Sequence, residues 1–116
     1  MIDYNKEVVS ALNKVLPTYY EMALHSGIKT PCYSYMELNN YAATEPTGAT
    51  IGYSYISFQI KVWSDKVADL QKYAQEADKA LRGLGFKRIS SGELYDMNSA
   101  MIQKVLTYEA LALENY

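Results

Sequence analysis

The clearest pattern in this chain is a strict alternation of large apolar residues with other side chains over positions 56–63. The apolar members are Ile56, Phe58, Ile60 and Val62. Because successive side chains of a strand point to opposite faces of a sheet, this pattern predicts a strand with one buried face. A register slip of one residue would turn all four side chains away from the core, so the register is strongly specified.

Two segments carry apolar residues at helical spacing. For the first, Asp3 is a suitable N-cap and Pro17 ends the helix, because the residue before a proline avoids the α region. For the second, Ser64 is the expected N-cap, and Gly83 and Gly85 end it. The apolar stripe of this second helix consists of Val67, Leu70, Ala74, Ala77, Leu81 and Leu84. We expect that stripe to lie on the sheet.

The other face of the second helix carries charged residues three or four positions apart, including Asp78 with Arg82. Such pairs contribute only about 0.2–0.5 kcal/mol each on an exposed helix. We therefore expect this face to be solvated and to hold no functional site.

Four further segments predict strands: 18–24, 32–43, 86–95 with an interruption at Ser90-Ser91-Gly92, and 101–113, where the final residues would also tolerate a helix. We expect the last two to pair as a hairpin. On the second segment, one face is expected to hold Cys32, Ser34, Met36 and Leu38, and the other Tyr33, Tyr35, Glu37, Asn39 and Tyr41.

The predicted fold class is α+β in the order α-β-β-β-α-β-β, a mostly antiparallel sheet with two helices packed on it. The 116 residues fit one domain, with an exposed hairpin loop at about 42–52 that is rich in turn-forming residues. The chain has no apolar stretch of membrane-spanning length and does not start like a signal peptide, so we expect synthesis and folding in the cytoplasm.

Charge and composition argue against some classes of function and in favour of others. Residues 1–60 hold three basic and five acidic side chains and residues 61–116 hold eight of each, so neither half has the basic excess of a DNA-binding protein. Cys32 is the only cysteine, which excludes an intramolecular disulfide and suits a buried position in a strand. The twelve tyrosines fit half-covered strands and subunit interfaces.

Residues with catalytic chemistry form no convincing site. His25 is the only histidine, lies beside Ser26 and Gly27 in an expected turn, and lacks the further ligands that a metal centre needs. The carboxylates Glu93 and Asp96, like those of the second helix, are expected to be solvent-exposed. Tyr55 and Trp63 could stack on nucleic-acid bases, but without basic neighbours beyond Lys61 that reading is weak. We predict that the protein is not an enzyme and uses neither cofactor nor metal.

The segment from Tyr55 to Ser64, the alanine-containing helix after it, Gly85-Phe86, and a closing hairpin with Lys104 and Tyr108 together resemble the tail completion or tail terminator proteins of long-tailed bacteriophages. This resemblance covers about residues 50–113. It implies a small α+β subunit that assembles into a ring, commonly a hexamer, at the head–tail joint of a virion made in the bacterial cytoplasm. The implied partners are copies of the chain itself, tail-tube proteins and head-connector proteins.

In that family, the loop before the long strand and the sheet edges tend to reach neighbouring subunits. The candidate interface residues are Tyr41, Glu45, Pro46, Thr47, Ile51, Tyr53 and Trp63. For Trp63 a second explanation stays open, in which the entry to the following helix folds over the indole. The alternative function is a module that binds a small molecule or peptide on a tyrosine-rich sheet face, which would require a deep apolar cavity. An enzyme built on His25, Cys32, Glu93 and Asp96 is a third hypothesis.

Overall fold

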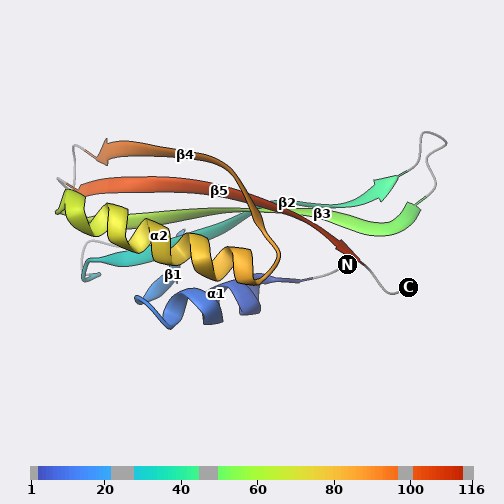
Figure 1. Ribbon diagram of the computed structural model, residues 1–116, viewed down its shortest axis with the longest axis horizontal. Coiled ribbons are helices and arrows are strands. Elements are labelled where there is room, and N and C mark those ends of the chain that lie inside the picture. The colour runs from blue at the N-terminus through green and yellow to red at the C-terminus, as the bar shows by residue number, and fades with distance from the viewer. Residues whose placement is uncertain (1–2, 22–27, 45–49, 97–100, 114–116) are drawn as a thin grey trace.

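The computed structural model describes residues 3–21, 28–44, 50–96 and 101–113 (Figure 1). The elements in chain order are α1 (Asn5–Asn13), β1 (Thr18–Tyr20), β2 (Cys32–Thr44), β3 (Thr50–Ser64), α2 (Val67–Gly83), β4 (Lys87–Asp96) and β5 (Met101–Leu113). The predicted order and the α+β class are confirmed.

The strands form a five-stranded sheet in the order β1-β2-β3-β5-β4. All neighbouring pairs are antiparallel except β1 with β2, which run parallel, so the sheet is mixed. The predicted hairpin of β4 and β5 is present, and β5 also pairs along β3 from Tyr53 to Ser64. The closing strand thus lies inside the sheet, and β4 forms its border.

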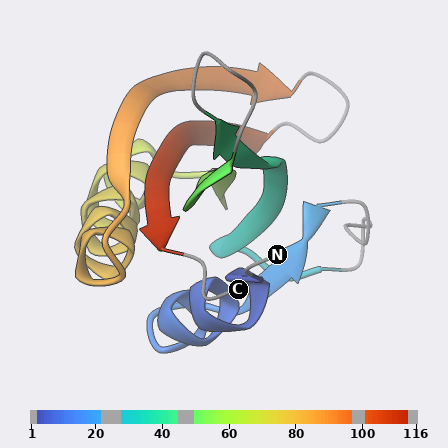
Figure 2. The ribbon, with the colours of Figure 1, turned by 90° about the vertical axis from the view of Figure 1, so that its right-hand side faces the viewer.

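Both helices lie on one face of the sheet, where α2 contacts β3, β5 and β4, while α1 contacts α2, β1 and β2. Seen along the long axis, the sheet is strongly curled and the helices lie next to one another (Figure 2). The core residues with no exposed surface include Ile56, Phe58, Ile60 and Val62 of β3 and Val8, Leu12, Leu70, Ala77 and Leu81 of the helices. Burying each large apolar side chain stabilises the fold by about 1.5–3 kcal/mol. The predicted inward face of β3 is confirmed.

The helix α2 ends at the position that Gly83 and Gly85 predict. The N–H of Phe86 donates to the carbonyl of Leu81, and the N–H of Gly85 donates to that of Arg82, each at 3.0 Å. Gly85 has a φ of +92°, which side chains with a Cβ rarely adopt. This pair of hydrogen bonds, with a left-handed residue after the last turn, is the Schellman motif.

The helix starts differ from the prediction. α1 begins at Asn5 with Tyr4 in the N-cap position, and the Asp3 carboxylate accepts the N–H of Asn5 at 2.9 Å. α2 begins at Val67 rather than next to Ser64, whose hydroxyl oxygen accepts the N–H of Lys66 at 3.1 Å. A polar side chain near a helix start identifies the region, but the first residue with helical backbone angles depends on how the chain leaves the preceding element.

Val67 was expected in the apolar stripe and is instead 56% exposed, because it starts the helix at an end that the sheet does not cover. The first strand is also shorter than predicted, since β1 ends at Tyr20 and residues 22–27, including His25, lie outside the described residues. β4 is continuous through Ser90-Ser91-Gly92, with its irregularity between Arg88 and Ser90.

The expected loop at 42–52 is largely strand. β2 continues to Thr44 and β3 resumes at Thr50, so backbone pairing extends into the segment that turn-forming residues suggested was irregular. Ala43 is buried at 4% exposure. The remaining part of that loop, residues 45–49, lies outside the described residues.

A bulge in β2 changes which residues share a face. The register of β2 with β3 shifts between Glu37 and Asn39, so that Leu38 is the extra residue. Before the shift Ser34 lies opposite Lys61, and after it Tyr41 lies opposite Tyr55. The predicted grouping of Tyr41 with Tyr33 is therefore wrong: Tyr33 faces the helices, and Tyr41 is on the opposite face of the sheet.

Candidate interaction surface

The hairpin of β2 and β3 extends well beyond the two helices and gives the molecule its long axis of 49 Å (Figure 1). We call its outer part, Tyr41–Thr44 with Thr50–Tyr55, the arm. The face of the sheet opposite the helices carries several exposed large side chains here: Tyr41 at 57%, Tyr53 at 39%, Tyr55 at 39% and Leu111 at 54%. We call these four residues the aromatic patch.

Strand register brings the patch together. Tyr55 lies between Tyr41 on β2 and Leu111 on β5, and the rings of Tyr41 and Tyr55 have centroids 5.3 Å apart. Tyr53 is two residues along β3 on the same face. Exposed neighbouring aromatic and apolar side chains are typical of the centre of a protein interface.

Two of the predicted interface residues, Tyr41 and Tyr53, belong to this patch. Glu45, Pro46 and Thr47 lie outside the described residues, and Ile51 lies in β3 with a side chain that is not described. Sequence reasoning missed Tyr55 and Leu111 as interface candidates. Tyr55 could have been found from its phase, which matches that of Tyr53, whereas Leu111 needed the register of β5.

Trp63 is at the opposite end of β3 from the aromatic patch and is not brought together with it. The indole N–H donates to the Ser34 hydroxyl oxygen at 2.9 Å, and the Lys61 ammonium lies 5.8 Å from the ring centroid. Lys61 also pairs with Glu21. These contacts hold the half-buried indole against β2, so residues of the same chain cover part of the Trp63 side chain.

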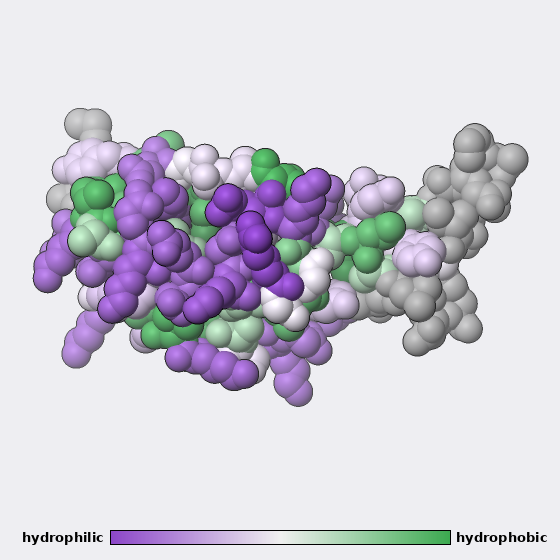
Figure 3. Space-filling model, viewed as in Figure 1, coloured by the Kyte–Doolittle hydropathy of each residue, from purple (hydrophilic) through white to green (hydrophobic). Residues whose placement is uncertain are grey.

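A second group of exposed apolar side chains follows the border strand β4. Ile89 is 49% exposed, Leu94 56% and Tyr95 61%. Figure 3 shows hydrophilic residues over the helix-bearing side of the body and hydrophobic groups near the base of the arm. Of the ten exposed large apolar side chains on the described residues, four form the aromatic patch and three follow β4, while Tyr20, Leu38 and Val67 lie elsewhere.

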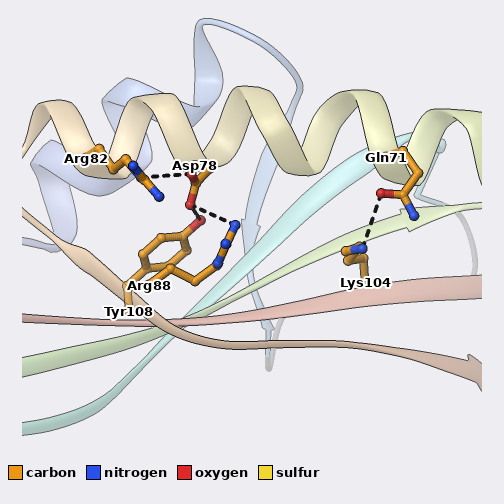
Figure 4. A network of polar contacts seen from close by, with 6 residues as sticks. All are labelled: Gln71, Asp78, Arg82, Arg88, Lys104 and Tyr108. Carbon is orange, nitrogen blue, oxygen red and sulfur yellow. Dashed lines mark hydrogen bonds and ion pairs between the residues drawn. The ribbon is translucent and has the colours of Figure 1, made fainter.

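A polar network connects α2 to the sheet (Figure 4). Asp78 accepts a hydrogen bond from the phenol of Tyr108 at 2.9 Å and pairs with Arg82 at 2.9 Å and Arg88 at 3.4 Å. Its side chain is 17% exposed. The expectation that Asp78 lies on a solvated face is therefore wrong, because Tyr108 on β5 and Arg88 on β4 reach it from the sheet.

A second polar network also links α2 to β4 and β5. Lys104 donates to the Gln71 side-chain oxygen at 3.3 Å and pairs with Glu93 at 3.5 Å, while the Gln71 amide donates to Glu93 at 3.0 Å. Glu93, one of the carboxylates considered for acid–base chemistry, is thus engaged in a half-exposed ion pair. Its predicted companion Asp96 has a side chain that is not described.

Shifted pKa values occur at three buried groups and at the exposed Asp3, where hydrogen bonds from Asn5 lower the pKa of the carboxyl. Burial raises the pKa of the Cys32 thiol to about 11, so the thiol is protonated at neutral pH and unsuited to nucleophilic attack. Burial also raises the pKa of Tyr33 and of Tyr108, the latter helped by its hydrogen bond to Asp78. The prediction that Cys32 is a buried strand residue is confirmed.

No metal cluster is found on the described part of the chain. No group of three or more His, Cys, Asp or Glu side chains there could hold a metal ion. One depression, of about 560 Å³, opens beside α1 and Tyr35, and another, of about 420 Å³, lies between α2 and strands β4 and β5. Both open to solvent and are lined largely by polar residues, unlike the deep apolar cavity that small-molecule binding requires.

Among the described helices, none is both long and apolar enough to cross a lipid bilayer.

Comparison with known proteins finds a likeness in structure only. No family model matches the chain, and no characterised protein matches it in sequence. A solved structure described as the virion of a native gene transfer agent particle contains a chain that superposes with a TM-score of 0.65 at 15% identity. The match covers 91% of this chain and 84% of that one. At this identity the likeness shows a shared fold.

Proposed function

We propose that this chain is a structural subunit of a phage or phage-like virion, without catalytic activity. The observation that carries the proposal is the fold shared with a chain of a gene transfer agent virion over nearly the whole of both chains. An aromatic patch on a protruding arm supports an assembly role.

Within the virion, we assign the subunit to the head–tail joint, where it forms a ring, commonly of six copies, that ends the tail tube. The resemblance of the β3–α2–β4–β5 region to tail completion and tail terminator proteins supports this position. The partners are then neighbouring copies, the tail tube below and the head connector above. Tyr41, Glu45, Pro46, Thr47, Ile51 and Tyr53 are proposed as contact residues, with Trp63 retained for a contact at the other end of β3.

Deletion of the gene from a particle-producing strain tests this function. We expect heads filled with DNA and free tails that fail to join, or tails of irregular length, in electron micrographs. Wild-type protein supplied from a plasmid should restore joined particles, and antibodies should locate it at the neck. Normal particles that lack the protein would contradict the proposal.

Complementation with variants tests the assigned surface separately. Tyr41→Ser combined with Tyr55→Ser should restore few joined particles, because it removes two of the four side chains of the aromatic patch, the pair whose rings are in contact. Val67→Ser is the matched control, since Val67 is as exposed as Tyr41 but lies on α2, away from the arm. Equal rescue by both variants would argue against a contact at the patch while leaving the deletion result to decide the function.

A further inference from the structure

The border strand β4 pairs with β5 along one side, and among the described residues no strand lies along its other side (Figure 1). Every residue from Lys87 to Tyr95 is exposed, and three of them carry large apolar side chains, Ile89, Leu94 and Tyr95. A long exposed edge presents a row of backbone donors and acceptors with which another strand can pair, so edge strands are usually short. β4 has 10 residues and is therefore a border at which a further strand can add.

A bulge determines which side chains of β4 share a face. The register of β4 with β5 shifts between Arg88 and Ser90, so Ile89 is the extra residue. Arg88 and Glu93 each bind a side chain of α2, and both therefore point to the helix side of the sheet. In a regular strand, residues five apart lie on opposite faces, so the bulge is what brings these two to the same face. Leu94, next to Glu93, points to the other side.

The residues of β4 are complementary to those of a second β4 that runs antiparallel and has the same bulge. With Gly92 opposite Gly92, residues on the helix side stand opposite residues on the helix side from Arg88 to Tyr95. Apolar residues and opposite charges that face each other across two strands stabilise their pairing. The facing positions are Ser91 with Glu93, the bulge of Ile89 and Ser90 with Leu94, Arg88 with Tyr95, and Lys87 with Asp96.

The order of charges along β4 favours its own copy in this arrangement. The strand begins with basic residues and ends with an acidic one, so antiparallel pairing places Lys87 opposite Asp96 at both ends. A parallel arrangement would place Lys87 beside Lys87, and a shifted register would place Glu93 opposite Glu93, so like charges oppose both alternatives. Arg88 and Glu93 already have ion-pair partners within the chain, so the charge term depends on Lys87 and Asp96.

Gly92, at the centre of this register, is not required by the fold of a single chain. Its φ is outside the left-handed region, and an added Cβ would meet nothing within 4 Å. Glycine inside a strand weakens it and often marks a place where another backbone approaches closely. A second copy of Gly92 facing the first would be such a backbone.

We infer that two copies of this chain form a symmetric dimer in solution by antiparallel pairing of their β4 strands, with the two-fold axis at Gly92. The same border is used on both copies, so the pairing closes after two. It does not build the proposed ring, whose contacts are assigned to the arm and to Trp63, and it leaves the arm free. The inference thus goes beyond the proposed function and can be tested on the purified protein.

Charge reversal at the ends of β4 tests the register by sedimentation equilibrium. Lys87→Glu and Asp96→Lys each place like charges opposite one another at both ends of the dimer, and each should raise the dissociation constant by about tenfold. The matched controls Lys66→Glu and Asp65→Lys make the same charge changes at exposed residues before α2 and should change it by less than about twofold. Equal effects of variants and controls would overturn the inference.

Combining the two reversals distinguishes this pairing from a general effect of charge. The double variant Lys87→Glu with Asp96→Lys again has opposite charges at each end, so it should associate nearly as well as the wild type. An equal mixture of the two single variants should associate better than either alone, because opposite charges then meet at both ends of the mixed dimer. If neither recovers association, although circular dichroism shows folded protein, the proposed register is wrong.

The apolar contact is tested with a pair of equally exposed residues. Leu94 and Val67 are both 56% exposed, and only Leu94 lies on β4. Leu94→Ser should raise the dissociation constant by about fivefold or more, while Val67→Ser should leave it unchanged. The opposite ranking would place the contact on α2 and overturn the inference.

A disulfide at the two-fold axis tests the geometry directly. Facing Cα atoms of two antiparallel strands are about 4.5–5.5 Å apart, within the range that a disulfide spans. In a Cys32→Ala background, Gly92→Cys should therefore form a covalent dimer under mild oxidation, seen by electrophoresis without reductant. Val67→Cys in the same background should remain monomeric. Equal crosslinking of both variants, or none at Gly92, would contradict an axis at this residue.

The outcomes separate this inference from the proposed function. A wild-type protein that stays monomeric at millimolar concentration overturns the β4 dimer, and the deletion experiment still decides the virion role. Normal particles from the deletion strain overturn the virion role, even if the purified protein dimerises as described.

Discussion

The phenol of Tyr108 on β5 donates a hydrogen bond to the Asp78 carboxylate on α2 across 2.9 Å. Tyr108 has no exposed surface, and Asp78 receives two guanidinium groups in addition, from Arg82 and Arg88. The contact joins the middle of the long helix to a central strand. It therefore contributes to the alignment of α2 over the sheet.

Substitution of Tyr108→Phe is expected to lower the free energy of unfolding by about 1–2 kcal/mol, because a half-buried carboxylate loses a donor that water replaces poorly. Urea denaturation measures the change. Tyr95→Phe is the matched control, since Tyr95 is 61% exposed and should change stability by less than about 0.5 kcal/mol. Equal stability of the two variants would mean that the Tyr108 hydroxyl makes no net contribution.

The two glycines at the end of α2 are expected to respond in opposite directions to alanine. An added Cβ would meet nothing within 4 Å at either position, but only Gly85 has a positive φ. Gly85→Ala should therefore lower the free energy of unfolding by about 1–2 kcal/mol through backbone strain. Gly83→Ala should raise it by about 0.5–1 kcal/mol, because alanine favours the helical backbone. Thermal unfolding of both variants checks the signs.

Replacing a core residue of α2 tests how the helix packs. Leu81→Ala should lower the free energy of unfolding by about 2–5 kcal/mol, because Leu81 has no exposed surface and its loss leaves a cavity against the sheet. Val67→Ala should change it by less than about 0.5 kcal/mol, since Val67 is largely exposed. Comparable losses in the two variants would contradict the packing of α2 described above.

Alkaline pH is expected to destabilise the protein. Burial raises the pKa of Cys32 from 9.0 to about 11 and raises the pKa of Tyr33 and Tyr108 above 10.0, so the folded state keeps protons that the unfolded state loses. Stability is then full below about pH 9 and falls as the pH rises, by up to about 1.4 kcal/mol per pH unit for each group. Urea denaturation at about pH 8 and about pH 11 measures the loss.

Cys32→Ala provides the control for the pH effect. Without the thiol, the slope between about pH 9 and about pH 10 should fall by about half, because the two tyrosines also begin to ionise in the unfolded state there, and the fall above that range should remain. A slope that is unchanged in the variant would show that the thiol ionises equally in the folded and unfolded states.

Local patterns were sufficient to predict the elements and the main buried face. The buried face of an element can be predicted from residues close together in the sequence. This was the case for β3, from the alternation of Ile56, Phe58 and Ile60, and for α2, from the helical spacing of Leu70 and Leu81. Gly85 predicted the end of α2 for the same reason, because its positive φ concerns a single residue. The order of helices and strands followed from these local preferences.

Tertiary structure decided which residues meet. Tyr41 joins Tyr55 because the bulge at Leu38 changes its face, and Leu111 joins them because β5 inserts next to β3 rather than at the border. Asp78 does not lie on a solvated face, because Tyr108 of β5 and Arg88 of β4 contact it from the sheet. Each of these contacts depends on strand register and strand order, which arise from the packing of segments distant in sequence. The hydrophobic periodicity of a single segment therefore does not predict them.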